Sequence, residues 1–111
     1  MKTIIAGSRN FTDCALLKQE CDKYEITEVV SGMAVGADFY GEVYAEEKEL
    51  PCTRFPADWK KHGNLAGRIR NREMADYGER LIAFWDGKSP GTKHMIKCAK
   101  ERNLEVIIIK Y

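Results

Sequence analysis

The sequence has no long apolar run and almost no excess of charge of either sign. None of its apolar stretches approaches the ~20 residues that a membrane-spanning helix needs. The N-terminal segment Met1–Gly7 breaks too early to form the apolar core of a signal peptide, so we expect a cytoplasmic protein. The formal charge is +1 at pH 7, whereas nucleic-acid-binding domains usually carry a basic excess. We therefore expect neither a membrane nor a nucleic-acid partner.

Common metal-binding and phosphate-binding motifs are also missing. The four cysteines, Cys14, Cys21, Cys52 and Cys98, form no C-x-x-C pair, and only two histidines accompany them. We expect these cysteines to be buried, reduced thiols and the protein to hold no metal. No G-K-S/T follows a glycine-rich turn, so the Walker P-loop is absent as well. The sequence thus names no particular cofactor.

Five short runs of apolar residues predict β-strands. Most of these runs are continuous rather than alternating, which is typical of strands that are covered on both faces in a parallel sheet. The predicted strands are Thr3–Ala6, Glu28–Ser31, Cys52–Phe55, Arg80–Trp85 and Glu105–Ile109.

Four segments with helical spacing of apolar residues lie between these strands. The predicted helices run from Asp13 to Tyr24, Val35 to Glu49, Asn64 to Tyr77 and Gly91 to Arg102. We expect Thr12 to cap the first helix and Pro56–Gly63 to be the longest irregular stretch. The strict alternation of strand and helix predicts one α/β domain over residues 1–111. This domain should be Rossmann-like, with three layers and a five-stranded parallel sheet of order 3-2-1-4-5.

Ligands of open parallel sheets bind outside the carboxyl ends of the strands, and glycines and small polar residues follow several of these strands. We expect the following residues to bind the ligand: Gly7, Ser8, Arg9, Ser31, Gly32, Gly36, Ala37, Asp38, Asp58, Trp59, Asn71, Trp85, Asp86, Gly87, Ser89, Gly91 and Thr92.

Two glycine-containing turns, Ser31–Gly36 and Ser89–Thr92, lead directly into predicted helices. Such turns allow close approach of an anion to free N–H groups at a helix N-terminus, although tight turns also need glycine for structural reasons alone. Together with Arg9, which can pair with a phosphate, they predict a phosphate-bearing or nucleotide ligand at this end of the sheet.

Several side chains near these turns have two interpretations. Asp38 and Glu42 either offset the helix dipole and face solvent, or face ribose hydroxyls or a base, because a carboxylate repels phosphate. Trp59 and Trp85 either pack at the rim or stack on a base. On the third helix, Arg68 and Asn71 either lie on a solvated face, turn inward to the ligand or contact another subunit.

Apolar stripes wider than one sheet face can cover indicate oligomerisation. The second helix carries Phe39, Tyr40 and Tyr44, and the third has a ragged apolar stripe. We expect a homodimer or higher homo-oligomer.

Five segments in combination carry a resemblance to a known family. They are Gly7–Arg9, Ser31–Asp38, Phe55–Trp59, Gly67–Met74 and Trp85–Thr92. Together they resemble the YspA-like branch of the SLOG superfamily, Rossmann-like domains related to the LOG phosphoribohydrolases and to the DNA-processing protein Smf/DprA. The resemblance covers nearly the whole chain. It implies binding of a nucleotide, a nucleotide derivative or a nicotinamide-type ligand.

The same resemblance bears on catalysis. LOG enzymes cleave the N-glycosidic bond of a nucleoside monophosphate, and their signature P-G-G-x-G-T-x-x-E ends in a catalytic glutamate. The matching segment here begins at Pro90, and Met95 occupies the place of the glutamate. Methionine cannot move a proton, so LOG-type catalysis is not expected. If turnover occurs, Asp38 and Glu42 are the candidate catalytic residues, because the second helix should carry both toward the cleft.

Three functions follow in order of preference. The first is a sensor, carrier or sequestering module for a nucleotide-derived ligand, possibly one like NAD or ADP-ribose. The second is a hydrolase or transferase acting on N-glycosidic bonds of nucleotides. The third, by analogy with Smf/DprA, is binding of single-stranded DNA, which the near-neutral charge disfavours.

Overall fold

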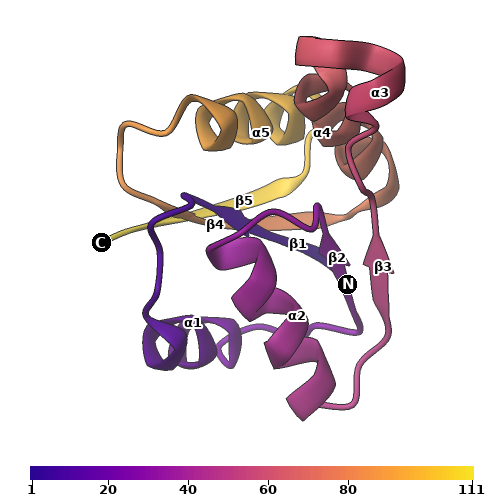
Figure 1. Ribbon diagram of the computed structural model, residues 1–111. Helices are drawn as coiled ribbons and strands as arrows, with labels where there is room; N and C mark the ends of the chain where they lie inside the picture. Colours follow the sequence, from indigo (N-terminus) through magenta and orange to yellow (C-terminus); the bar gives the residue numbers. More distant parts are fainter.

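The computed structural model describes residues 1–111. Its centre is a five-stranded sheet in which every neighbouring pair is parallel, with strand order β3-β2-β1-β4-β5 (Figure 1). The predicted fold class and strand order are therefore confirmed. The strands are β1 (Lys2–Gly7), β2 (Glu28–Ser31), β3 (Cys52–Arg54), β4 (Arg80–Trp85) and β5 (Glu105–Lys110).

Helices cover both faces of the sheet. On one face lie α1 (Cys14–Cys21) and α2 (Ala37–Glu47), and on the other lie α4 (Ala66–Tyr77) and α5 (Pro90–Glu101) (Figure 1). A single turn, α3 (Trp59–His62), and the 3-10 turn η1 (Gly63–Leu65) precede α4. None of these helices has the length and apolar character that crossing a bilayer requires.

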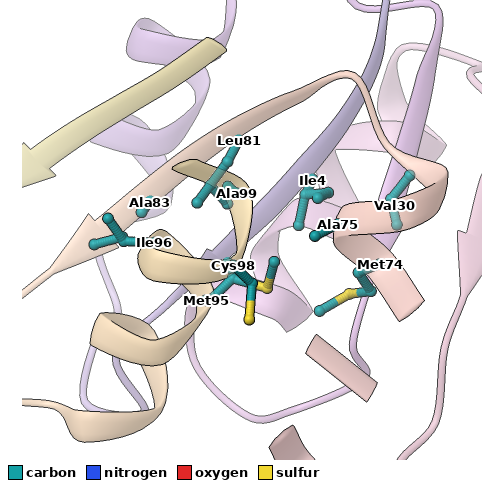
Figure 2. Packing of buried hydrophobic residues seen from close by; sticks show 11 residues of the cluster. Ile4, Val30, Met74, Ala75, Leu81, Ala83, Met95, Ile96, Cys98 and Ala99 are labelled. Atoms are coloured by element: carbon teal, nitrogen blue, oxygen red, sulfur yellow. The ribbon is translucent and has the colours of Figure 1, made fainter. Parts of the chain in front are cut away.

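Two apolar clusters form the core because successive strand residues point to opposite faces. Ile4 and Leu81 belong to the cluster beneath α4 and α5, whereas Ile5 and Ile82 belong to the cluster beneath α1 and α2. Figure 2 shows the first cluster, in which sulfur-containing side chains of α4 and α5 pack together. This double coverage explains why the strands are continuous apolar runs.

Several helix ends differ from the prediction, and the structure gives the reason for two of them. The side chain of Asp13, rather than that of Thr12, caps α1 by accepting a hydrogen bond from Leu16 N at 3.0 Å. The predicted start of α2 at Val35 is also wrong, because Gly36 has φ +83° and stands as the N-cap. A residue with this backbone conformation cannot belong to a right-handed helix, so α2 begins at Ala37.

The segment predicted to be irregular, Pro56–Gly63, contains the short helix α3. Asp58 caps it by accepting from Lys61 N at 3.1 Å, and Gly63, with φ +56°, ends it.

The expectation of four buried cysteines is half right: Cys21 and Cys98 are buried, but Cys14 and Cys52 are only half-buried. Tyr44, predicted to leave apolar surface uncovered, is 4% exposed.

Candidate functional site

The main cleft opens at the carboxyl ends of β1 and β4, between α4 and the N-termini of α2 and α5. Its volume is about 480 Å³, within the range of small-molecule sites. Arg9, Arg68 and Arg70 line it, whereas Asp38 is its single carboxylate. The remaining lining residues are small, polar or apolar: Ala6, Gly7, Ala34, Trp59, Asn64, Gly67, Asn71, Met74, Ser89, Pro90, Gly91, Thr92, His94 and Met95.

The N-terminus of α5 supplies the cleft with backbone N–H donors. Pro90 stands at the first helical position, and the preceding Ser89 makes no side-chain capping bond. The N–H groups of Gly91 and Thr92 belong to the first turn and so lack intrahelical partners. The position of Gly91 is open as well, since a Cβ added there would meet nothing within 4 Å. This helix end can therefore receive an anion.

Arg70 and Asp38 lie on either side of Gly32. Arg70 Nη1 donates to the carbonyl oxygen of Gly32, and Asp38 Oδ2 accepts from Ala34 N at 3.4 Å. A Cβ added at Gly32 would fall 2.7 Å from Arg70 Nη1 and 2.9 Å from Asp38 Oδ2. A side chain at this position would displace the ends of Arg70 and Asp38, so Gly32 permits the observed arrangement of the pair.

Burial dominates the electrostatics of this pair. Asp38 is 4% exposed, and the loss of solvation raises its pKa to about 6, although the charge of Arg70 and the N–H groups of Ala34 and Gly32 lower it in part. Burial also lowers the pKa of Arg70, against the opposing effect of Asp38. A carboxyl group that titrates near pH 6 inside a cleft is suited to proton transfer or to accepting hydroxyl hydrogen bonds.

Asn71 holds together three parts of the cleft wall. Its Oδ1 accepts from Arg70 Nε at 3.1 Å, and its Nδ2 lies 3.4 Å from the carbonyl oxygen of Gly91 and 3.1 Å from His94 Nδ1. The side chain is buried and turns inward, so of the interpretations open for Asn71 the solvated face is excluded. It positions Arg70 relative to the start of α5.

His94 and Cys98 lie one turn apart on α5, with Sγ 3.6 Å from Nε2. A nucleophilic cysteine is activated by a histidine base, which an amide side chain can orient. Cys98, His94 and Asn71 are of these three residue types. Burial raises the pKa of the Cys98 thiol and, with the charges of Arg68, Arg72 and Lys97, lowers the pKa of His94. A thiol at 1% exposure within the core cluster does not form a reactive thiolate.

The N-terminus of α2 is less accessible than that of α5. A Cβ added at Gly36 would collide with Ser8 O and lie 2.8 Å from Arg9 O, and one added at Gly7 would collide with Phe84 O. These two glycines therefore allow backbone segments to approach each other. They were predicted to allow the approach of an anion, and the structure favours the structural alternative at both positions.

Glu42 does not accompany Asp38 into the cleft, so this part of the prediction is wrong. Its carboxylate accepts from Ser31 Oγ at 2.7 Å and from Arg54 Nε at 2.9 Å. It lines a separate hollow of about 420 Å³ between α2 and β3. The reason is the rise of about 1.5 Å per residue along a helix, which carries Glu42 one turn farther from the strand ends than Asp38.

Eight of the predicted ligand-binding residues line the cleft, and Ser8, Trp85 and Asp86 support its wall from outside the lining. Ser8 N donates to Phe84 O, and Ser8 Oγ accepts from Asp86 N at 3.1 Å. Trp85 Nε1 donates to Ser89 O at 3.1 Å. The predicted residues outside the lining are Ser8, Ser31, Gly32, Gly36, Ala37, Asp58, Trp85, Asp86 and Gly87.

Asp86, one of these supporting residues, shapes the turn that leads into α5. Its carboxylate accepts from Lys88 N and Ser89 N, both at 2.8 Å, and these bonds lower the pKa of its carboxyl group. The carboxylate of Asp86 therefore already has hydrogen-bond partners in the turn before α5. Asp58 is occupied in the same way at α3.

Sequence reasoning missed Arg70 as a site residue. The chain did contain a usable signal: Ala66, Arg70 and Met74 are spaced four residues apart, and both Ala66 and Met74 are buried. Residues four apart share one face of a helix, so an arginine between two buried apolar residues must turn inward. The cleft wall also includes Asn64, Gly67 and His94, which no sequence pattern singled out.

A resident metal ion has no evident ligand set. The structure contains no group of three or more His, Cys, Asp or Glu side chains that could hold one.

Comparison with known proteins identifies the family of this chain. The model of the YAcAr family, described as YspA, cpYpsA-related SLOG family, matches residues 1–62. The matched region includes Gly7–Arg9, Ser31–Asp38 and Phe55–Trp59, but not Arg70 or α5. The Gene 61 protein of Mycobacterium phage D29 is 36% identical over 85 residues, with coverage of 71% of this chain and 68% of that protein.

A solved structure shares the fold. The X-ray structure of DNA processing protein A (DprA) from Streptococcus pneumoniae matches 99% of this chain with a TM-score of 0.81 and 17% sequence identity. The chain spans half the length of that structure, since 50% of the DprA chain is covered. At this level of identity the likeness concerns the fold alone.

Proposed function

The chain belongs to the YspA, cpYpsA-related SLOG family, and from this premise we propose that it binds a nucleotide or nucleotide derivative in the cleft at the carboxyl ends of β1 and β4. The observation that carries the proposal is the convergence of three groups on one cavity. These are the open N-terminus of α5, the arginines Arg9, Arg68 and Arg70, and the buried carboxyl of Asp38. The first two suit a phosphate, and the third suits ribose hydroxyls.

The distribution of charge along the chain supports an anionic ligand on this side. Residues 59–102 contain eleven Lys and Arg and five Asp and Glu. Residues 13–50 contain three Lys and Arg and ten Asp and Glu. The net charge of +1 therefore conceals a basic region, which includes α4 and α5, and an acidic region, which includes α1 and α2. An anion approaching the molecule is attracted to the basic region that includes two walls of the cleft.

Calorimetric titration with AMP, ADP-ribose, NAD and inorganic phosphate tests the proposal. We expect at least one nucleotide to bind with higher affinity than inorganic phosphate. A short single-stranded DNA serves as a further titrant, and binding of DNA alone would favour the DNA-binding alternative. Mass spectrometry of the denatured, freshly purified protein would identify a ligand that copurifies. The proposal fails if none of the three nucleotides binds and no nucleotide copurifies.

A second candidate function, hydrolysis of an N-glycosidic bond, draws support from Asp38. Its carboxyl titrates near pH 6 within the cleft, where it is able to activate a water that attacks C1′ and displaces the base. Met95 lines the cleft and offers no acid. Chromatography of AMP incubations for free adenine tests this function. Release that disappears in Asp38→Asn would support it, and background release in the wild type would exclude it for AMP.

Exposed apolar side chains near the start of α2 form a candidate surface for self-association. Met33, Val35 and Phe39 are 51%, 62% and 56% exposed and line one shallow hollow near the start of α2. Large exposed apolar groups that lie together commonly mark contact surfaces. We propose that two copies meet there, and sedimentation at micromolar concentration should show a dimer that Phe39→Ser dissociates.

A further inference from the structure

We infer that Trp59 is an aromatic platform on which the base of the ligand stacks, so that the cleft selects nucleotides over phosphosugars. This inference rests on the proposed function and adds to it the part of the ligand that confers specificity. Trp59 lines the cleft and yet is 56% exposed. A large aromatic side chain that lines a cleft without being covered by its own protein offers its ring to a ligand.

The structure fixes the position of Trp59 from both sides. It is the first residue of α3, whose cap is Asp58, and Gly63 N donates to Trp59 O at the end of the turn. The ring lies against α4 at Gly67, where an added Cβ would be 3.6 Å from Trp59 Cη2. This separation is an ordinary van der Waals contact, so the indole lies beside α4 next to the cleft.

Core packing does not account for this tryptophan. Neither α3 nor η1 contributes a buried residue. Trp85, the other tryptophan, is different: it packs against the core cluster beneath α5, and its Nε1 donates to Ser89 O. Rim packing and base stacking were open for both tryptophans. Trp85 packs at the rim of the core, whereas Trp59 lies beside the cavity.

The part of the cleft near Trp59 is suited to the base of the ligand. The N–H groups of α5 suit a phosphate, and Asp38 repels one but accepts ribose hydroxyls. Trp59 and Asn64, which precede α4, are uncharged residues of the lining, and Trp59 is its one aromatic side chain besides the imidazole of His94. An indole provides a stacking surface and an amide provides both a donor and an acceptor for base edges.

The test compares AMP with ribose 5-phosphate, which lacks the base. We expect the wild-type protein to bind AMP at least about tenfold more tightly by calorimetry, the lower part of the range for stacking of one base. Trp59→Ala should remove this preference while leaving the affinity for ribose 5-phosphate unchanged. Trp59→Phe, which retains an aromatic ring, should keep most of it.

Fluorescence provides a second measurement, because the protein contains two tryptophans. In Trp85→Phe, the emission comes from Trp59 alone, and AMP should quench it whereas ribose 5-phosphate should not. Equal affinity for AMP and ribose 5-phosphate in the wild type would overturn the inference and leave phosphate binding intact. A Trp59→Ala variant that keeps its preference for AMP but sediments differently would assign Trp59 to a contact between copies. If neither compound binds, both the proposed function and the inference fail.

Discussion

The helices α2 and α5 both begin at the carboxyl end of the sheet after a glycine-containing turn, but only α5 presents an open N-terminus. Gly36, before α2, is pressed against the backbone of Ser8 and Arg9, and Asp38 places a carboxyl in the first turn. Gly91, within the first turn of α5, has open space around it and no acid beside it. Similar sequence patterns therefore lead to two different local structures, one in which the glycine meets neighbouring backbone and one in which it meets open space.

The largest expected effect separates these two glycines. Gly36→Ala should lower the free energy of unfolding by about 2–4 kcal/mol, because a side chain at φ +83° is strained and its Cβ collides with Ser8 O. Gly91→Ala should change stability by less than about 0.5 kcal/mol, since its Cβ meets nothing. Urea denaturation of both variants measures the difference. Equal destabilisation would show that the two turns are alike.

The acid in the first turn of α2 should make stability depend on pH. The pKa of Asp38 is raised to about 6 in the folded protein, from an ordinary value of 3.8. The folded state therefore holds the proton more tightly than the unfolded state, and the protein should lose stability as pH rises from about 4 to about 6. Asp38→Asn should remove this loss and be more stable above pH 6 by up to about 3 kcal/mol.

Denaturation midpoints of the wild type and Asp38→Asn between pH 4 and pH 8 measure this effect. The two proteins should converge near pH 4, where Asp38 is protonated in both states. Parallel profiles over the whole range would show that Asp38 is not responsible.

Arg9 should contribute to binding at the open end of the cleft. Arg9→Ala should weaken the binding of AMP by about 1–3 kcal/mol, the usual range for the loss of a charge-assisted hydrogen bond. Arg72→Ala is the matched control, because Arg72 is exposed and does not line the cleft. Calorimetry at constant ionic strength compares the two. An equal loss in both variants would indicate a general effect of charge rather than a contact.

The smallest expected effect concerns the cap of α5. Ser89 makes no side-chain capping bond, so Ser89→Ala should lower stability by less than about 0.5 kcal/mol. Asp13→Ala, which removes a capping bond from α1, should cost about 1 kcal/mol. Thermal unfolding of both variants provides the comparison. A larger loss in Ser89→Ala would mean that Ser89 satisfies the α5 amides and that this terminus is not open.

Local pattern was sufficient for the architecture and for part of the cleft. Continuous apolar strands alternating with amphipathic helices predicted the parallel sheet, and the rule that ligands bind at carboxyl ends placed Arg9, Asp38 and Ser89 beside one another. Glu42 was misplaced because a shared helix face does not show how far along the helix the cleft extends, and one turn takes Glu42 beyond it. Arg70 was missed because an arginine on a charged helix is usually solvated, and its hydrogen bond to the carbonyl oxygen of Gly32 is visible only in the structure.

The sequence by itself determined the order of the sheet, since crossover handedness and double coverage leave few arrangements for five alternating units. It also determined that a helix begins near Thr92 after a small-residue turn. Only the tertiary structure decided which glycines face backbone and which face open space, because this depends on the separation of β1, β4 and α2 in three dimensions. For the same reason it alone brought Asp38 and Arg70, thirty-two residues apart in the chain, to opposite sides of Gly32.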